Sequence, residues 1–139
     1  FDYSIHQYIM VSAAQKKQAK ITKELITSIL HSNFSHKIMS LLYETGVLER
    51  FFPPFENTMF LAQFDGYHAY PVEIHTLETV KHLENIKDNF VKSVFDSFDA
   101  EDKIYLKLAA LFHDIGKGRG GNHSLIGARI FASFAKKIG

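Results

Sequence analysis

The feature that most constrains this sequence is a largely apolar segment, residues 104–112, that ends in the polar pair His113-Asp114. If this segment forms a helix, its apolar side chains lie on nearly every face of that helix. We therefore expect a central, buried helix over residues 104–115. An imidazole and a carboxylate placed together in such a setting cost free energy unless a partner takes them up. Because both groups are metal ligands, the pair marks the end of this helix as a candidate metal site.

The composition narrows the class of protein further. The sequence has no cysteine, which excludes disulfides and thiolate metal sites. The formal net charge of +1 gives no field that would favour nucleic acid or an anionic membrane. No apolar run approaches the ~20 residues of a membrane span, and no signal peptide is visible, so we expect a cytoplasmic protein. The sequence begins without an initiator Met, and it ends within a helical pattern. We therefore expect a fragment of a longer protein.

Helical periodicity dominates the remaining sequence, and no segment is typical of a β-strand. Apolar residues recur at three- and four-residue steps, which predicts an all-α fold built as a helical bundle. Asp99 and Asn122 are suitable N-caps for the last two helices. The expected helices cover residues 11–30, a short segment that ends before Gly46, residues 72–98 with a break at about 85–89 left open, residues 104–115, and a last segment after Asn122.

Pro53-Pro54 is the best internal boundary, because consecutive prolines favour an extended or turn conformation. It divides residues 1–54, which we interpret as a helical linker segment, from a bundle domain over residues 55–139. Residues 55–70 are rich in aromatic side chains, and we expect irregular but well-packed chain there. The role of His68 in this stretch is left open between a structural and a site residue.

Three histidines and one aspartate are the candidate metal ligands: His75, His113, Asp114 and His123. They fall at the ends of three predicted helices, which an antiparallel bundle can bring together at one end. Imidazole and carboxylate together suit Mn, Fe, Zn or Ni, and an added carboxylate or phosphate ligand makes Mg acceptable. Such an ion can polarise a phosphoryl oxygen and activate water near neutral pH. His82 follows His75 by two helical turns and stays open as a weaker candidate.

A glycine-rich loop, residues 117–121, follows the pair and carries Lys117 and Arg119. With the N-terminus of the last helix behind it, this loop is a candidate phosphate cradle. The alternative for Lys117 is a cation that merely complements the end of the preceding helix, and the glycines can equally form a simple turn.

These motifs together resemble the HD superfamily of metal-dependent phosphohydrolases, which is named for the adjacent His-Asp pair. The longer string from His113 to Ala128, with residues 63–70 and His75-Thr76-Leu77, is similar to the HD domain of the bifunctional uridylyltransferase/uridylyl-removing enzymes of bacterial nitrogen signalling. This resemblance implies an all-α hydrolase domain that removes UMP from a tyrosine of the PII signalling protein.

The resemblance also implies roles for individual residues. His75, His113 and Asp114 are expected to bind the metal, and His123 to be a further ligand or a phosphate contact. Lys117 is expected to hold the phosphate and, with Asp114, to be catalytic. The superfamily completes its metal shell with a later Asp, and no Asp follows Asp114, so we expect a C-terminally incomplete HD domain. Whether this chain is active alone is left open.

Two alternatives remain at this point. The chain can be an HD hydrolase of small nucleotides or cyclic dinucleotides. It can also be a sensory module that binds nucleotide or metal without turnover.

Overall fold

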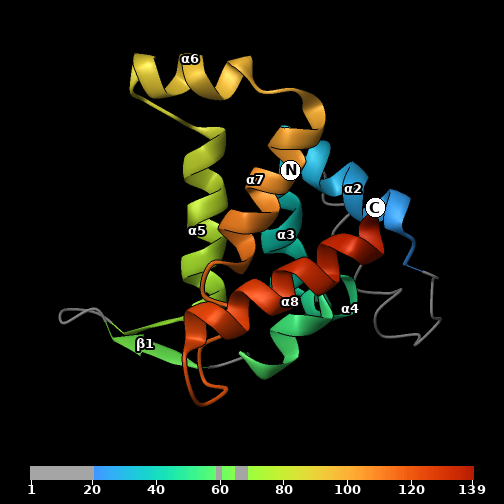
Figure 1. The fold of residues 1–139 in the computed structure, drawn as a ribbon, viewed down its shortest axis with the longest axis vertical. Helices are drawn as coiled ribbons and strands as arrows, with labels where there is room; N and C mark the ends of the chain where they lie inside the picture. The colour runs from blue at the N-terminus through green and yellow to red at the C-terminus, as the bar shows by residue number, and fades with distance from the viewer. Residues whose placement is uncertain (1–20, 59–60, 65–68) are drawn as a thin grey trace.

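The computed structural model describes residues 21–58, 61–64 and 69–139 of the chain. The predicted all-α class is confirmed, with one small β-ribbon added (Figure 1). None of the described helices is long and apolar enough to span a membrane. The elements are α2 (Lys23–His31), α3 (Ser35–Glu44), α4 (Leu48–Phe51), the 3-10 helix η1 (Pro53–Asn57), β1 (Ala62–Phe64), β2 (Ala69–Pro71), α5 (Val72–Glu84), α6 (Asn89–Ser97), α7 (Ala100–Phe112) and α8 (His123–Ile138).

The β-ribbon corrects our expectation that the sequence contains no strand. β1 and β2 pair antiparallel, with Gln63 opposite Tyr70. Strands of three residues are too short to show the alternation by which a strand is predicted, so the aromatic stretch looked irregular. His68 and the part of the first expected helix that precedes residue 21 lie outside the described residues.

We also expected an extended or turn conformation at Pro53-Pro54, but the structure has neither an extended segment nor an isolated turn there, because both prolines begin the 3-10 helix η1. The fixed φ of proline suits the first turn of a helix, where its missing N–H would have no partner in any case. The domain boundary that we placed at these prolines stays a prediction.

The predicted helix caps are confirmed. The side chain of Asp99 accepts a hydrogen bond from the backbone N–H of Asp102 at the start of α7. Asn122 does the same for the first turn of α8. The break left open in the long helix is present, because α5 ends at Glu84 and α6 starts at Asn89.

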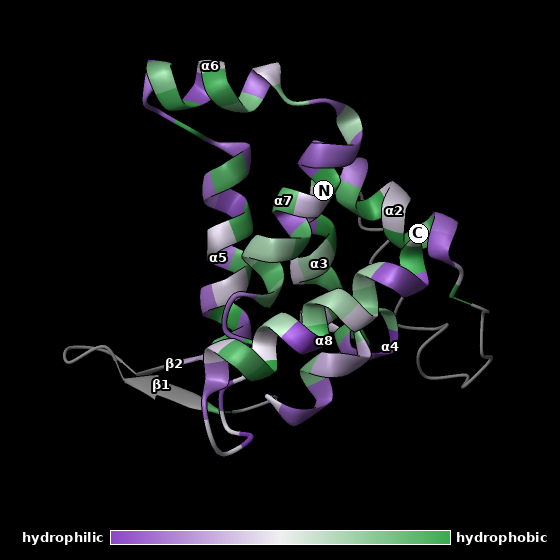
Figure 2. Ribbon diagram, in the orientation of Figure 1, coloured by the Kyte–Doolittle hydropathy of each residue, from purple (hydrophilic) through white to green (hydrophobic). Residues whose placement is uncertain are grey.

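α7 is central, as predicted, and packs against α2, α5 and α8. Its Leu108, Leu111 and Phe112 are buried in the core. The ring of Phe112 packs against that of Phe134 on α8, with the ring centroids 5.1 Å apart. It also packs against the ring of Phe52, the residue after α4, at a centroid distance of 6.4 Å. α6 differs from the other helices: it carries hydrophobic residues, yet it lies apart from the bundle and buries none of them (Figures 1 and 2).

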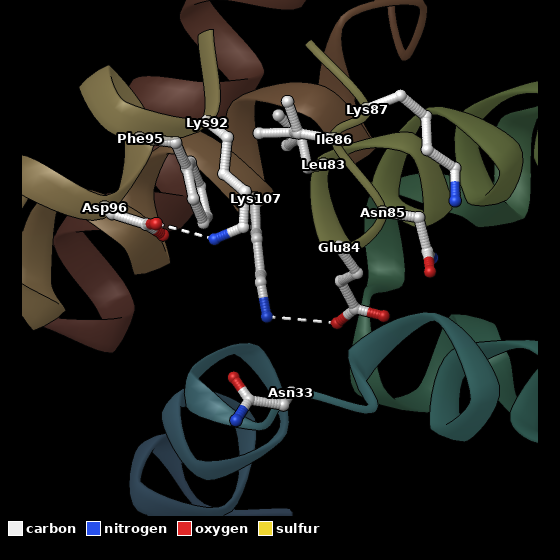
Figure 3. A pocket seen from close by; sticks show the side chains of 10 residues that line it. All are labelled: Asn33, Leu83, Glu84, Asn85, Ile86, Lys87, Lys92, Phe95, Asp96 and Lys107. Atoms are coloured by element: carbon white, nitrogen blue, oxygen red, sulfur yellow. Dashed lines mark hydrogen bonds and ion pairs between the residues drawn. The ribbon is translucent and has the colours of Figure 1, made fainter. Parts of the chain in front are cut away.

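A buried ion pair holds α5 and α7 together at the end near α6. The ammonium of Lys107 donates to Glu84 Oε1 at 3.0 Å, to Ser35 Oγ at 2.9 Å and to the carbonyl oxygen of Ser32. These bonds use all three N–H groups of the ammonium. Glu84 in turn accepts from the backbone N–H of Ser35 at 2.8 Å. Figure 3 shows Lys107 extending toward Glu84 along one wall of a small pocket.

Candidate metal centre

Three of the predicted ligands meet at the other end of the α5–α7 pair. His75 lies in the first turn of α5, His113 follows the last residue of α7, and Asp114 is the next residue in the chain. The two imidazole Nε2 atoms are 3.1 Å apart. Asp114 Oδ2 lies 3.5 Å from Nε2 of His75 and 3.3 Å from Nε2 of His113. Two helices and one turn therefore direct three donor atoms at a single point.

The spacing of these atoms fits a divalent metal ion. Donors bound to one ion at about 2.1 Å lie about 3.0–3.4 Å from one another in octahedral or tetrahedral geometry. The three observed separations, 3.1, 3.3 and 3.5 Å, fall within or close to this interval. Two imidazoles and one carboxylate leave coordination positions open for water or substrate, which is typical of catalytic centres.

The backbone of α7 fixes the orientation of the His113 ring. Nδ1 of His113 lies 2.7 Å from the carbonyl oxygen of Ala110, three residues earlier. A carbonyl oxygen only accepts, so Nδ1 must carry the proton and donate it. In the neutral ring, Nε2 then carries the lone pair and faces Asp114 and Nε2 of His75. Metal-binding histidines are commonly oriented by such a bond from the other ring nitrogen.

The turn after α7 is held against the start of α8, and this places Asp114. A Cβ atom on Gly116 would overlap the carbonyl oxygen of His123 and lie 2.8 Å from the backbone nitrogen of Gly127. Glycine is therefore required at residue 116 for this close approach. This close approach packs the turn that carries Asp114 against α8, and Asp114 is buried there beside the two histidines.

Lys117 is the fourth predicted site residue that reaches the group. Its ammonium donates to Asp114 Oδ2 at 2.8 Å. The Lys117 side chain is 27% exposed, while that of Asp114 is 11% exposed. The centre thus combines one carboxylate, two imidazoles and one cation that solvent can reach.

Arg119 and His123 are not brought into this group. Arg119 donates through Nε to the carbonyl oxygen of Ile115 at 3.1 Å and through Nη2 to that of Pro54 at 2.7 Å, so it ties the glycine loop to η1. His123 begins α8 as an exposed residue and lies outside the cluster of ligand atoms formed by the described residues. Their phosphate and metal roles stay predictions. His82, in the last turn of α5, is also exposed and outside the cluster.

The sequence interpretation missed two features near the centre. The carbonyl oxygen of Ala110 orients His113, and its position three residues earlier on the same helix would have been a usable signal. Glu73 is a fully buried carboxylate two residues before His75, where nothing in the sequence pattern pointed to burial. Burial raises the pKa of the Tyr43 hydroxyl, and the Glu73 carboxylate raises it further.

Residues 72–139, which contain this candidate centre, match the HD domain family and form an HD domain. No solved structure shows significant similarity to the chain.

The relatives point to a particular group of HD proteins. The chain is 41% identical over 102 residues to the bifunctional uridylyltransferase/uridylyl-removing enzyme of Vibrio parahaemolyticus, covering 70% of this chain and 12% of that protein. It is 40% identical over 101 residues to the enzyme of the same name from Acinetobacter baylyi, covering 68% of this chain and 11% of that protein. The Acinetobacter baumannii (strain ACICU) enzyme is 35% identical over 123 residues, or 83% of this chain and 14% of the relative. The chain therefore spans about an eighth of the length of these relatives.

Proposed function

We propose that His75, His113 and Asp114 hold a divalent metal ion and that the domain is a metal-dependent phosphohydrolase. The convergence of three ligand atoms within 4.8 Å at the helix ends carries this proposal. The donor set suits Mn, Fe or Zn, and Mg is acceptable if substrate and water add oxygen ligands. When bound, the ion supplies Lewis-acid polarisation of a phosphoryl group and lowers the pKa of water.

The residues of the chain have separate tasks in this proposal. Asp114 supplies the negative charge that attracts the cation, and its burial keeps that charge poorly screened. His113 is held in one orientation by Ala110, so its lone pair needs no reordering. Lys117 lies beside Asp114 and is partly exposed, so its ammonium can contact the phosphate of a substrate that reaches the centre.

The proposed reaction is removal of a uridylyl group, and the proposed substrate is a PII-type signalling protein that carries UMP on a tyrosine. The similarity to proteins named uridylyl-removing enzymes supports the reaction. An aryl phosphodiester of this kind has a phenolate leaving group, which eases the demand for a strong general acid.

The direct test is release of UMP from a uridylylated PII-type protein by this chain with Mn²⁺. We expect UMP release that depends on the metal and falls at least tenfold in Lys117→Ala, with metal affinity changed less than threefold. Bis(p-nitrophenyl) phosphate and a cyclic dinucleotide serve as competing substrates. Faster turnover of the cyclic dinucleotide would contradict the proposed substrate. Stoichiometric metal binding with no hydrolysis of any of the three would contradict the proposed activity.

A further inference from the structure

A second recessed surface lies between η1 and α8, on residues that are not part of the metal centre. This groove has a volume of about 450 Å³. Pro53, Pro54 and Phe134 contribute apolar surface to it. No aspartate or glutamate is among the residues that line it.

Basic side chains line the same groove. Arg129 and Lys137 lie on the exposed side of α8, and Ser133 lies between them. Steps of four residues place these side chains along one face of the helix. At 1.5 Å per residue, Arg129 and Lys137 are about 12 Å apart along the helix axis. The groove thus presents a row of donors and not a single point of positive charge.

Neither Arg129 nor Lys137 is neutralised within the part of the chain that the structure describes. The ion pairs of lysine and arginine there use Lys81, Lys92, Lys107 and Lys117, and none involves Arg129 or Lys137. Arg119 adds a further guanidinium at the groove, with two of its N–H groups committed to backbone carbonyls. The electrostatic requirement of the groove is therefore for a negatively charged occupant.

We propose that this groove is a docking site for an acidic peptide segment of a protein partner. Carboxylates would pair with Arg129 and Lys137, and an apolar side chain between them would pack on Phe134 and the two prolines. An extended segment rises about 3.3 Å per residue, so carboxylates about four residues apart match the 12 Å row. A single phosphate fits less well, because tight phosphate sites need donors that converge on one group.

The probe is a fluorescein-labelled peptide, Glu-Glu-Leu-Val-Glu-Glu. Its neutral counterpart, the Gln peptide, is the same peptide with every Glu replaced by Gln. Anisotropy titrations at low ionic strength compare the 139-residue chain with Arg129→Gln/Lys137→Gln. The control is Lys87→Gln/Lys136→Gln, which also removes two positive charges, but from exposed residues outside this groove. We expect the groove variant to bind about five- to tenfold more weakly and the control to stay within twofold, because two exposed ion pairs are lost in only one of them.

Three results would overturn the proposal. These are equal weakening in both variants, equal binding of the Gln peptide, and displacement of the acidic peptide by millimolar inorganic phosphate at constant ionic strength. Melting temperatures by circular dichroism must agree among the variants. The proposal does not depend on catalysis: neither Arg129 nor Lys137 belongs to the metal centre, so metal-dependent hydrolysis of bis(p-nitrophenyl) phosphate should be unchanged in the groove variant.

Discussion

Two carboxylate–ammonium pairs, at opposite ends of the packed helices α5 and α7, differ in what surrounds them. Glu84 and Lys107 are joined at 3.0 Å with side chains 9% and 6% exposed. Asp114 and Lys117 are joined at 2.8 Å, but the Lys117 side chain is 27% exposed. In the first pair every ammonium N–H has a protein acceptor. In the second, the carboxylate also faces two imidazole nitrogens.

The antiparallel packing of the two helices explains why the two pairs are separate. His75 and Glu84 are nine residues apart on α5, which is about 13 Å along the helix. His75 meets Asp114 at one end of the two helices, and Glu84 meets Lys107 at the other. The comparison teaches that an ion pair alone does not mark a functional site. Partial exposure and several ligand atoms directed at one point distinguish the metal centre from the structural pair.

The largest expected effect comes from breaking the buried Glu84–Lys107 pair. Lys107→Met leaves the carboxylate of Glu84 buried without its cation, so we expect a loss of about 3–5 kcal/mol in the free energy of unfolding. Urea denaturation followed by circular dichroism measures this loss. The double variant Glu84→Gln/Lys107→Met removes the stranded charge and keeps an acceptor for Ser35, so it should recover at least half of the stability. A loss below 1 kcal/mol in the single variant would show that the pair contributes little.

Changes to the Asp114–Lys117 pair should have the opposite effect, with a large loss of metal affinity and a small loss of stability. Asp114→Asn keeps the shape of the side chain but removes the charged ligand, so we expect Mn²⁺ affinity to fall about 100-fold or more. The free energy of unfolding should change by less than about 1 kcal/mol, because the partners of Asp114 are partly exposed. Isothermal titration calorimetry and urea denaturation report the two quantities. A destabilisation like that of Lys107→Met would mean that both pairs are structural.

A matched pair of histidine variants sharpens the limits of the centre. His75→Ala removes one of the three converging atoms and should weaken Mn²⁺ binding about tenfold or more. His123→Ala removes an exposed ring outside the cluster and should weaken binding less than threefold. Equal losses would show that His123 completes the metal shell, as the sequence resemblance implies.

The smallest expected effect is a pH dependence of the free energy of unfolding that comes from His36. This residue lies beside the buried Glu84–Lys107 pair, and its backbone N–H donates to Glu84. The pKa of His36 is lowered because burial disfavours the imidazolium, although Glu78 acts in the opposite direction. The unfolded chain therefore binds more protons once the pH falls below about 6.5. The stabilisation by neutral His36 is complete above that pH and is lost as the pH falls toward the lowered pKa.

Urea titrations at pH 7.5 and 5.5 test this sign. The wild-type chain should lose more stability between the two pH values than His36→Gln, whose side chain does not titrate. An equal or smaller loss in the wild-type chain would contradict the lowered pKa.

The sequence predicted the features that depend on local chemistry. The apolar segment before His113 indicated a central helix, Asp99 and Asn122 indicated helix starts, and the His113-Asp114 pair indicated the candidate metal site. Each of these signals lies within a few residues of the feature it predicts, so no knowledge of tertiary packing is needed.

The features that the sequence missed depend on how separate segments rotate and pack. Lys107 and Glu84 are 23 residues apart, and nothing local shows that they share a buried pair. Arg119 lies in the loop expected to hold phosphate, but its partner is the carbonyl oxygen of Pro54, 65 residues away in the sequence. The β-ribbon pairs strands too short to carry a pattern.

The central claim is that one divalent ion binds between the helix ends, and crystals soaked in Mn²⁺ test it most directly. An anomalous difference map should show one strong peak in contact with Nε2 of His75, Nε2 of His113 and Oδ2 of Asp114. The same soak of Asp114→Asn crystals should lose that peak. A wild-type map with no peak among these three atoms, or with the strong peak elsewhere on the chain, would contradict the account.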